Sequence, residues 1–243
     1  MHEVYGLSDI GIARQNNEDL FASMLELDFF ALCDGMGGHN AGEIAAKETL
    51  FDLCKAAIAL RKEAVDPKRL IFKLRDTIKK TNRRIYDMGR DNSAFHGMGT
   101  TLCCLFLNNS QAICAHVGDS RIYRYSRGSL LRLTEDHSLK NKLIKQGEIM
   151  EEDVLPPPYN HIITKAIGPA LAIEPSIRSC RVAQGDILFL CSDGLSDHLP
   201  ESDMEKILQE KSPLKKKAEQ LILAAKEAGS RDNITILMVR VSV

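Results

Sequence analysis

Short apolar runs divide the chain into segments that predict buried strands. These runs contain β-branched and aromatic residues and are bounded by turn-forming residues, which is typical of strands in a core. Asn108-Asn109 and Ser126-Arg127-Gly128 mark hairpin turns, so we expect mainly antiparallel sheets. The predicted strands cover residues 4–11, 21–33, 101–107, 111–117, 120–125, 178–182, 186–191 and 233–243.

Other stretches repeat apolar residues every three or four positions, which predicts amphipathic helices. One runs from Gly42 to about Ala64, and a second begins at Pro67 and carries an apolar stripe that includes Leu70 and Leu74. We interpret this stripe as core packing. Shorter helices are predicted over residues 139–148, 202–208 and 214–226.

The order of these elements predicts an α+β fold. Strands, two helices, strands, two helices and a last strand fit a four-layer α-β-β-α sandwich, in which two central, mainly antiparallel β-sheets are flanked by helix pairs. One segment is too acidic and proline-rich for a core element, because residues 151–153 are acidic and 156–158 are prolines. Strands resume soon after it. We therefore expect residues 1–243 to form a single domain with an exposed flap over about 141–163.

The composition argues against several functions. The 32 basic and 33 acidic residues give a net charge of -1, so there is no electrostatic case for nucleic acid or an anionic membrane. No apolar run approaches the roughly 20 residues that span a bilayer, and residues 1–4 do not resemble a signal peptide. The seven cysteines lack a C-x-x-C pair and lie mostly in apolar runs. We expect reduced thiols, a cytoplasmic location and no thiol-bound zinc.

Three aspartates lie at the ends of apolar runs that are far apart in the sequence. Asp34 follows residues 29–33, Asp193 follows 187–191 by two positions, and Asp232 shortly precedes 234–239. A charged carboxylate at the end of a core strand is costly unless it is compensated, and an oxygen-liganded divalent metal is the usual compensation. One Asp-Gly would only indicate a turn. Three such aspartates predict a metal-dependent active site.

The segment 8–19 places an arginine and two adjacent carboxylates between two predicted strands. In isolation it would be interpreted as a polar hairpin loop. Beside the three aspartates, Arg14, Glu18 and Asp19 become candidates for the same site. Neighbouring residues of an extended chain point in opposite directions, so one carboxylate could face a metal while the other orients a water ligand.

Seven motifs in order resemble those of the metal-dependent serine/threonine protein phosphatases, type 2C (PPM), in their compact bacterial form. Each motif is weak alone, but together they span nearly the whole chain at family-like spacing. They read Ser8-Asp9-x-Gly11-x-x-Arg14-x-x-Asn17-Glu18-Asp19, Asp34-Gly35-Met36-Gly37-Gly38, Gly99-Thr100-Thr101, Gly118-Asp119-Ser120-Arg121, Leu133-Thr134-x-Asp136-His137-Ser138, Ser192-Asp193-Gly194-Leu195-Ser196-Asp197 and Arg231-Asp232-Asn233-Ile234-Thr235.

The resemblance implies a set of metal ligands. Asp34 would bridge two divalent ions, Gly35 would offer its backbone carbonyl to one of them, and Asp193 and Asp232 would complete the protein ligands of the other. Glu18 and Asp19 would act mostly through metal-bound waters. A third, weaker metal site would lie between Asp119 and Asp193.

The resemblance also implies residues that act beside the metals. Arg14 would hold the substrate phosphate, because its planar fork can make two charge-assisted hydrogen bonds. Asn233 and Asp197 would support the site. Hard oxygen ligands suit Mn²⁺ or Mg²⁺ rather than zinc. Two such ions roughly 3.5–4 Å apart can bind a bridging hydroxide that attacks phosphorus in line.

The general acid stays unassigned. Animal members of the family have a histidine after the Asp-Gly of the second motif, whereas this chain has Met36, as bacterial relatives usually do. A metal-bound water is our first choice. His39 and His137 are more distant candidates, and a structural or surface role is favoured for each.

The expected function is hydrolysis of phosphoserine and phosphothreonine in proteins phosphorylated by a serine/threonine kinase, by a monomeric enzyme. Two alternatives remain open. A catalytically inactive phosphoprotein-binding relative would need a lost metal ligand, and none is missing. Another metal-dependent phosphoester hydrolase, such as a nuclease, is disfavoured by the neutral charge and the absence of a basic, aromatic-rich groove.

Overall fold

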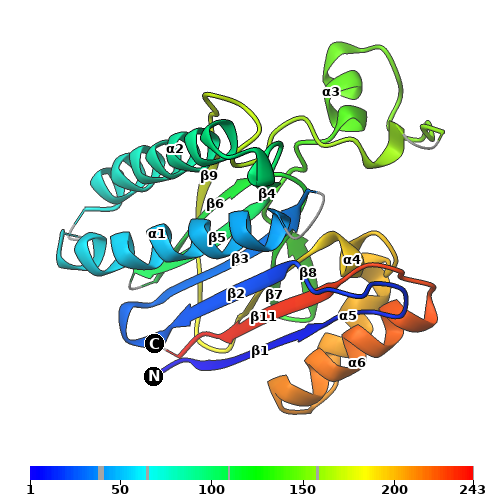
Figure 1. Ribbon diagram of the computed structural model, residues 1–243. Helices are drawn as coiled ribbons and strands as arrows, with labels where there is room; N and C mark the ends of the chain where they lie inside the picture. Colours follow the sequence, from blue (N-terminus) through cyan, green and yellow to red (C-terminus); the bar gives the residue numbers. More distant parts are fainter. Residues whose placement is uncertain (38–40, 64–65, 109, 157–158, 243) are drawn as a thin grey trace.

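Two antiparallel sheets pack face to face between two layers of helices (Figure 1). The computed structural model describes residues 1–37, 41–63, 66–108, 110–156 and 159–242. The first sheet has the order β1-β11-β10-β7-β8, and the second has the order β2-β3-β5-β6-β9, with β4 paired to β3. This arrangement confirms the expected α-β-β-α sandwich.

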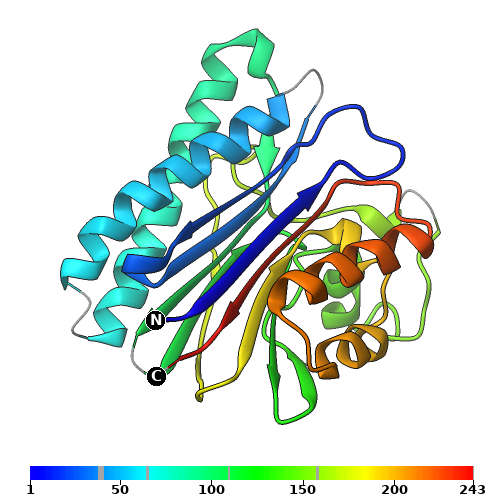
Figure 2. The same cartoon turned by 90° about the horizontal axis from the view of Figure 1, so that it is seen from below.

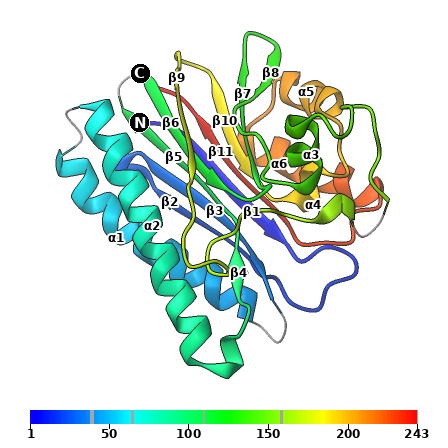
Figure 3. The ribbon, with the colours of Figure 1, turned by 90° about the horizontal axis from the view of Figure 1, so that it is seen from above.

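The strands of the first sheet are β1 (Glu3–Asp9), β7 (Arg121–Ser126), β8 (Ser129–Arg132), β10 (Ile187–Cys191) and β11 (Ile234–Arg240). Those of the second sheet are β2 (Asp19–Met24), β3 (Phe29–Met36), β4 (Gly99–Thr100), β5 (Leu102–Asn108), β6 (Gln111–Val117) and β9 (Ser176–Arg181). Long helices α1 (Ala41–Glu63) and α2 (Pro67–Asp91) cover the second sheet. On the far side, α4 (Asp193–Ser196), α5 (Glu201–Gln209) and α6 (Leu214–Glu227) cover the first sheet, as Figure 3 also shows.

Each central strand is apolar on both faces because it separates two cores. On β3, Phe29, Ala31 and Cys33 pack against the α1–α2 layer, whereas Phe30 and Leu32 face the other sheet. The alternation follows from the period of two in a strand. On β10, Phe189 and Cys191 likewise face the helices of the first sheet, and Leu188 and Leu190 face the space between the sheets. This explains why these strands occur in the sequence as continuous apolar runs.

The predicted strand over residues 21–33 is wrong as a single element. Residues Leu25–Leu27 form a short 3-10 turn, and Asp28 follows with a left-handed φ of 51°. The chain thereby reverses and pairs β2 with β3. Leu25 and Leu27 are partly buried against the core, so they continue the apolar positions of the strands, and only Glu26 and Asp28 mark the reversal in the sequence. The sequence analysis also missed β8, β4 and α4.

The helix boundaries follow local capping. At α2, Pro67 occupies the first turn and the Asp66 side chain accepts a hydrogen bond from the Lys68 backbone N–H at 2.9 Å. Helix α3 (Leu139–Gln146) begins at the Ser138 cap and ends before Gly147, which has a φ of 72°. The end of the predicted first helix at Ala64 lies outside the described residues.

The predicted flap lies apart from the layers. The segment that contains α3 and the 3-10 turn η3 (Tyr159–His161) extends beyond the sheet edges in Figure 1. Its prolines 157 and 158 lie outside the described residues. No helix in the described part of the chain is both long and apolar enough to cross a membrane.

Candidate active site

The chain ends and the candidate site lie at opposite ends of the sandwich. Strands β1 and β11 pair along their length, with Glu3 opposite Arg240 near the termini and Asp9 opposite Ile234 at the other end. Figure 2 shows the loop after β1 beside the loop that leads into β11, away from the termini. The 10–18 loop and Asp232 are therefore brought together by strand pairing.

Five carboxylates from distant parts of the chain line one cavity of about 310 Å³ at this end. Asp34 comes from β3, Asp193 begins α4 two residues after the end of β10, and Asp232 precedes β11. Antiparallel pairing of β10 with β11 brings the last two together. The carboxylates that line the cavity are Glu18, Asp34, Asp119, Asp193 and Asp232.

Burial and mutual repulsion raise the pKa values of these carboxyl groups. Desolvation is the largest cause for Asp34 and Asp193, whose pKa values lie well above the usual range, and neighbouring aspartates raise them further. The pKa of Asp119 is raised to about 6, again mainly by desolvation. Desolvation also raises the pKa of Glu18. Such a cluster of hard oxygen atoms is stabilised by a bound cation, so the residues fit Mn²⁺ or Mg²⁺.

The carboxylates of the cavity do not converge on one ion position in this arrangement. Within the described ranges, no three carboxylate, imidazole or thiol groups are already close enough to hold one ion. Asp232 is engaged elsewhere, because its Oδ2 accepts a hydrogen bond from Arg14 Nη2 at 2.6 Å. Ligation by several aspartates would therefore require side-chain rotation and release of Asp232 from Arg14.

Asp19 lies behind the cavity rather than in its wall. It is 2 % exposed, is opposite Asp34 in the β2–β3 register, and accepts a hydrogen bond from Ser192 Oγ at 2.7 Å. Desolvation raises its pKa to about 6. Glu18 lines the cavity instead, so the two adjacent carboxylates do point in different directions. Ser192 directly precedes Asp193, so this hydrogen bond links Asp19 to the chain beside Asp193.

Asn233 fastens the 10–18 loop to the start of β11. Its Oδ1 accepts from the Glu18 backbone N–H at 2.9 Å, and its Nδ2 donates to the backbone carbonyls of Ile10 at 3.0 Å and Asn16 at 2.9 Å. The backbone is also tightly packed here, since a Cβ on Gly194 would lie 2.0 Å from the Asn233 carbonyl oxygen. Glycine is therefore required after Asp193.

Asp197 does not line this cavity. It pairs at 3.2 Å with Arg121, which also donates to the Ser196 carbonyl at 2.8 Å and forms an ion pair with Asp136 at 2.8 Å. Arg121 thus ties the end of α4 to the segment that leads into the flap. Arg121, Asp136 and Asp197 line a neighbouring cavity of about 630 Å³, which Asp119 also lines.

The contacts of each histidine show whether it packs inside the protein or lines the cavity. The ring of His137 stacks on His116 at 4.6 Å and accepts from the Gly118 N–H at 3.1 Å, and burial lowers its pKa to about 3. It is therefore a packing residue. His39 lies outside the described residues. The sequence analysis missed His161, a flap residue that lines the cavity with its Nδ1 3.7 Å from Asp197 Oδ2.

Thr101 was also not assigned a role, although it belongs to one of the seven motifs. It lines the cavity, and its Oγ1 accepts a hydrogen bond from the Asp34 backbone N–H at 3.0 Å. It therefore fixes the strand that carries Asp34. No sequence signal marks His161, because a histidine in an exposed loop becomes informative only once the flap is placed.

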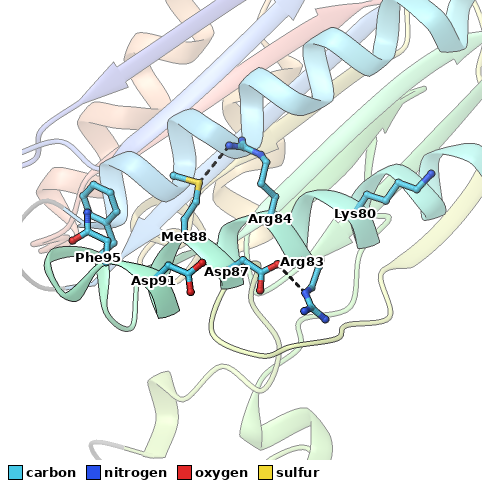
Figure 4. Close-up of a pocket in the computed structure, with 8 residues that line it drawn as sticks. Lys80, Arg83, Arg84, Asp87, Met88, Asp91 and Phe95 are labelled. Atoms are coloured by element: carbon cyan, nitrogen blue, oxygen red, sulfur yellow. Dashed lines mark hydrogen bonds and ion pairs between the residues drawn. The ribbon is translucent and has the colours of Figure 1, made fainter.

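A cavity of about 550 Å³ at the C-terminal end of α2 contains none of the predicted site residues (Figure 4). Its charged side chains already pair with one another, as in the 2.9 Å contact between Arg83 Nε and Asp87 Oδ2. Arg84 is likewise bonded to Glu48 and Asp52 of α1. This cavity is a consequence of helix packing and not a second candidate active site.

Known proteins with similar sequences cover almost the whole chain. A serine/threonine phosphatase of Listeria monocytogenes is 37% identical over 96% of this chain and 93% of its own length. Protein phosphatase PhpP of Streptococcus pneumoniae is 37% identical over 98% of this chain and 96% of its own.

Solved structures give the same result. The serine/threonine phosphatase of S. agalactiae superposes with a TM-score of 0.89, at 35% identity and with 100% of both chains covered. The catalytic domain of serine/threonine protein phosphatase PstP, described in complex with two manganese ions, has a TM-score of 0.84 at 30% identity, covering 100% of this chain and 99% of that one. The family model described as protein phosphatase 2C matches residues 6–143. This chain belongs to the protein phosphatase 2C family.

Proposed function

We propose that this member of the family hydrolyses phosphoserine and phosphothreonine in proteins. The relatives named as serine/threonine phosphatases match nearly the full chain, which supports this specificity. The single observation that carries the proposal is the cavity of about 310 Å³, in which five carboxylates from five separate segments lie beside Arg14.

The proposed metal ligands are the residues of that cavity. Two Mn²⁺ or Mg²⁺ ions would be held by Asp34, the Gly35 carbonyl, Asp193 and Asp232, with Glu18 and the buried Asp19 acting through water ligands. Asp119 and Asp193 would hold a third ion more weakly. When bound, these cations supply Lewis-acid activation of water and of the phosphoryl group. A relative of known structure with two manganese ions supports this cofactor.

The other residues would bind the substrate phosphate or hold the segments around the cavity in place. Arg14 would exchange its contact with Asp232 for the phosphate oxygens, which it can hold with two charge-assisted hydrogen bonds. Asn233 would keep Glu18 and the 10–18 loop against β11 through its three hydrogen bonds. Asp197 would act more remotely, by holding Arg121 against α4. His161, which lines the cavity, joins the candidates for the general acid.

We also propose that residues 1–243 act as one domain with the flap as part of it. The apolar core between the two sheets supports this, because it joins side chains of β3, β5 and β6 to those of β10 and β11. The physiological substrates are expected to be products of a serine/threonine kinase. The seven free cysteines favour a reducing compartment such as the cytoplasm. A monomeric state stays a prediction.

Hydrolysis of a phosphoserine or phosphothreonine peptide with and without added Mn²⁺ tests the proposal. We expect phosphate release only with metal, and none from Asp193→Asn. Binding of Mn²⁺ measured by calorimetry serves as the second readout. Metal and phosphopeptide binding without turnover would favour the inactive binding relative. Turnover of a phosphodiester but not of the phosphopeptide would favour another phosphoester hydrolase.

A further inference from the structure

Two cysteines lie close together on neighbouring strands, away from the candidate site. Cys114 lies on β6 and Cys180 on β9, at the edge of the second sheet. In the β6–β9 register Cys180 is opposite Ala112, so Cys114 is its diagonal neighbour on the same face. Each thiol is close enough to perturb the ionisation of the other.

The two thiols differ in access to solvent. Cys114 is 3 % exposed and belongs to the apolar core between the sheets, whereas Cys180 is partly exposed and packs against that core from its edge. A small solute can therefore reach Cys180 first. Cys114 lies behind it and is shielded from solvent.

Positive charge surrounds Cys180. Arg178 lies two residues away on β9, and Arg124 reaches across from β7 of the facing sheet, where its Nη1 donates to the Arg181 carbonyl at 2.6 Å. The Nε of Arg124 is buried and has no hydrogen-bond partner among the described residues. The interaction with the Cys114 thiol and then these guanidinium groups lower the pKa of Cys180 to about 7, against the opposing effects of burial and Asp186.

We propose that Cys180 and Cys114 form a peroxide-sensitive dithiol that closes to an intramolecular disulfide. In the first step, the Cys180 thiolate attacks a hydroperoxide, the O–O bond breaks, and Cys180 becomes a sulfenic acid as the peroxide is reduced to water or an alcohol. In the second step, the Cys114 sulfur attacks the sulfenic sulfur and the S–O bond breaks. Water leaves with the Cys114 proton, so two thiols and one hydroperoxide give one disulfide.

The fold permits this closure. A diagonal pair must approach more closely before a disulfide can form, because its Cβ atoms need to be about 3.5–4.5 Å apart. Strand β9 is paired on one side only, so it can shift toward β6 without breaking a second set of strand hydrogen bonds. Loss of the Cys180 negative charge after the first step also removes a repulsion that opposes ionisation of Cys114.

Cys54 provides an internal control. It is also partly exposed, but burial raises its pKa. At pH 7 we expect N-ethylmaleimide to modify Cys180 at least about fivefold faster than Cys54, because a thiolate fraction at least about fiftyfold larger is partly offset by lower nucleophilicity. Equal rates at the two sites would overturn the proposed activation of Cys180.

The decisive experiment treats the full chain with hydrogen peroxide and maps the products by mass spectrometry. We expect a peptide linked through Cys114 and Cys180, loss of two hydrogen atoms from the intact mass, and full reversal by dithiothreitol. Cys114→Ser should instead stop at a Cys180 sulfenic acid that dimedone traps. Cys180→Ser should give no linkage while keeping the circular dichroism spectrum and thermal unfolding of the parent, which shows that the variant is folded.

Two other products would contradict the proposal. One is over-oxidation of Cys180 in the parent protein without any linkage to Cys114. The other is a disulfide between two copies of the chain, detected by non-reducing electrophoresis. Because these readouts do not depend on hydrolysis, failure of the dithiol proposal and failure of the proposed phosphatase activity remain distinguishable.

Discussion

Arg14 and Asp232 form an ion pair in the wall of the carboxylate cavity, with Arg14 Nη2 2.6 Å from Asp232 Oδ2. The hydrogen bond to Asp232 is the largest cause of the raised pKa of Arg14. One residue proposed to bind phosphate is thus paired with one proposed to bind metal. Occupation of Asp232 by a cation would leave the arginine fork available for phosphate, which couples the two binding events.

Arg14→Ala should raise KM for a phosphopeptide more than it lowers kcat. A hydrogen bond to a charged group contributes about 1.5–3 kcal/mol, which corresponds to roughly a ten- to hundredfold change in KM. Arg14→Lys keeps the charge without the fork, so it should recover only part of the loss. Steady-state kinetics at saturating Mn²⁺ measures this effect. An unchanged KM in Arg14→Ala would show that Arg14 does not contact the substrate.

Chelation should abolish hydrolysis, and Mn²⁺ or Mg²⁺ should restore it while Ca²⁺ does not. Calcium is larger and accepts irregular coordination, so it would position the reactants poorly. Phosphate release after EDTA treatment and dialysis against each metal measures this. Full activity in the presence of chelator would refute the metal assignment, and restoration by Ca²⁺ would refute the coordination argument.

Asp34→Asn and Asp193→Asn should each lower kcat by several orders of magnitude, because each removes a proposed metal ligand. In the metal-free protein the same variants should be more stable than the parent at pH 7, since each removes a negative charge from a cluster whose members repel one another. Chemical denaturation in EDTA measures the stability. Asp76→Asn, an exposed helix substitution, is the matched control and should change neither quantity appreciably.

The flap should govern which phosphoproteins are accepted. We expect replacement of residues 151–160 by a Gly/Ser linker to lower kcat/KM for phosphoproteins much more than for p-nitrophenyl phosphate, because loops on a rigid scaffold set selectivity. The replacement leaves His161 and Ile163, which line the cavity, in place. Equal losses on both substrates would instead assign the flap a part in the catalytic step.

His137 should make the protein less stable in mild acid. Burial lowers its folded-state pKa from 6.5 to about 3. The unfolded chain therefore takes up a proton below about pH 6.5 that the folded protein refuses until about pH 3, so this histidine reduces stability as the pH falls through that window. The raised carboxyl pKa values act in the opposite direction, so the test compares variants rather than absolute stabilities.

Denaturation of the parent and of His137→Gln at pH 7 and pH 5 measures the effect. On going from pH 7 to pH 5, we expect the free energy of unfolding of the parent to fall relative to that of His137→Gln. His96→Gln, at an exposed position, should follow the parent. The same pH dependence in the parent and in His137→Gln would show that His137 takes up its proton without cost in the folded state.

The fold was largely accessible from the sequence because its signals are local. Runs such as 29–33 and 187–191 are apolar on both faces, which identifies core strands, and the helical stripe of α2 through Leu70, Leu74 and Ile78 identifies a packed face. The one misassigned strand, 21–33, failed for a physical reason. Its turn keeps the partly buried Leu25 and Leu27, so the acidic Glu26 and Asp28 look like the outward positions of a continuing strand.

From the sequence, only the residues of the candidate site could be predicted, and not their contacts. The apolar runs identified Asp34, Asp193 and Asp232, and the motif order identified the rest. No local sequence pattern predicts that the Glu18 backbone bonds to Asn233, 215 residues later, that Asp19 bonds to Ser192 behind the cavity, or that His161 reaches the cavity. Strand pairing and the placement of the flap decide these contacts.

One physical reason separates what the sequence determines from what depends on the tertiary structure. Side-chain periodicity and turn chemistry act over a few residues, so the sequence by itself determined which segments become strands or helices and which carboxylates lie at their ends. Electrostatic environment depends on distance through space. The raised pKa of Asp34, the partner of Arg14 and the contact between Cys114 and Cys180 were therefore decided only when the two sheets and their loops came together.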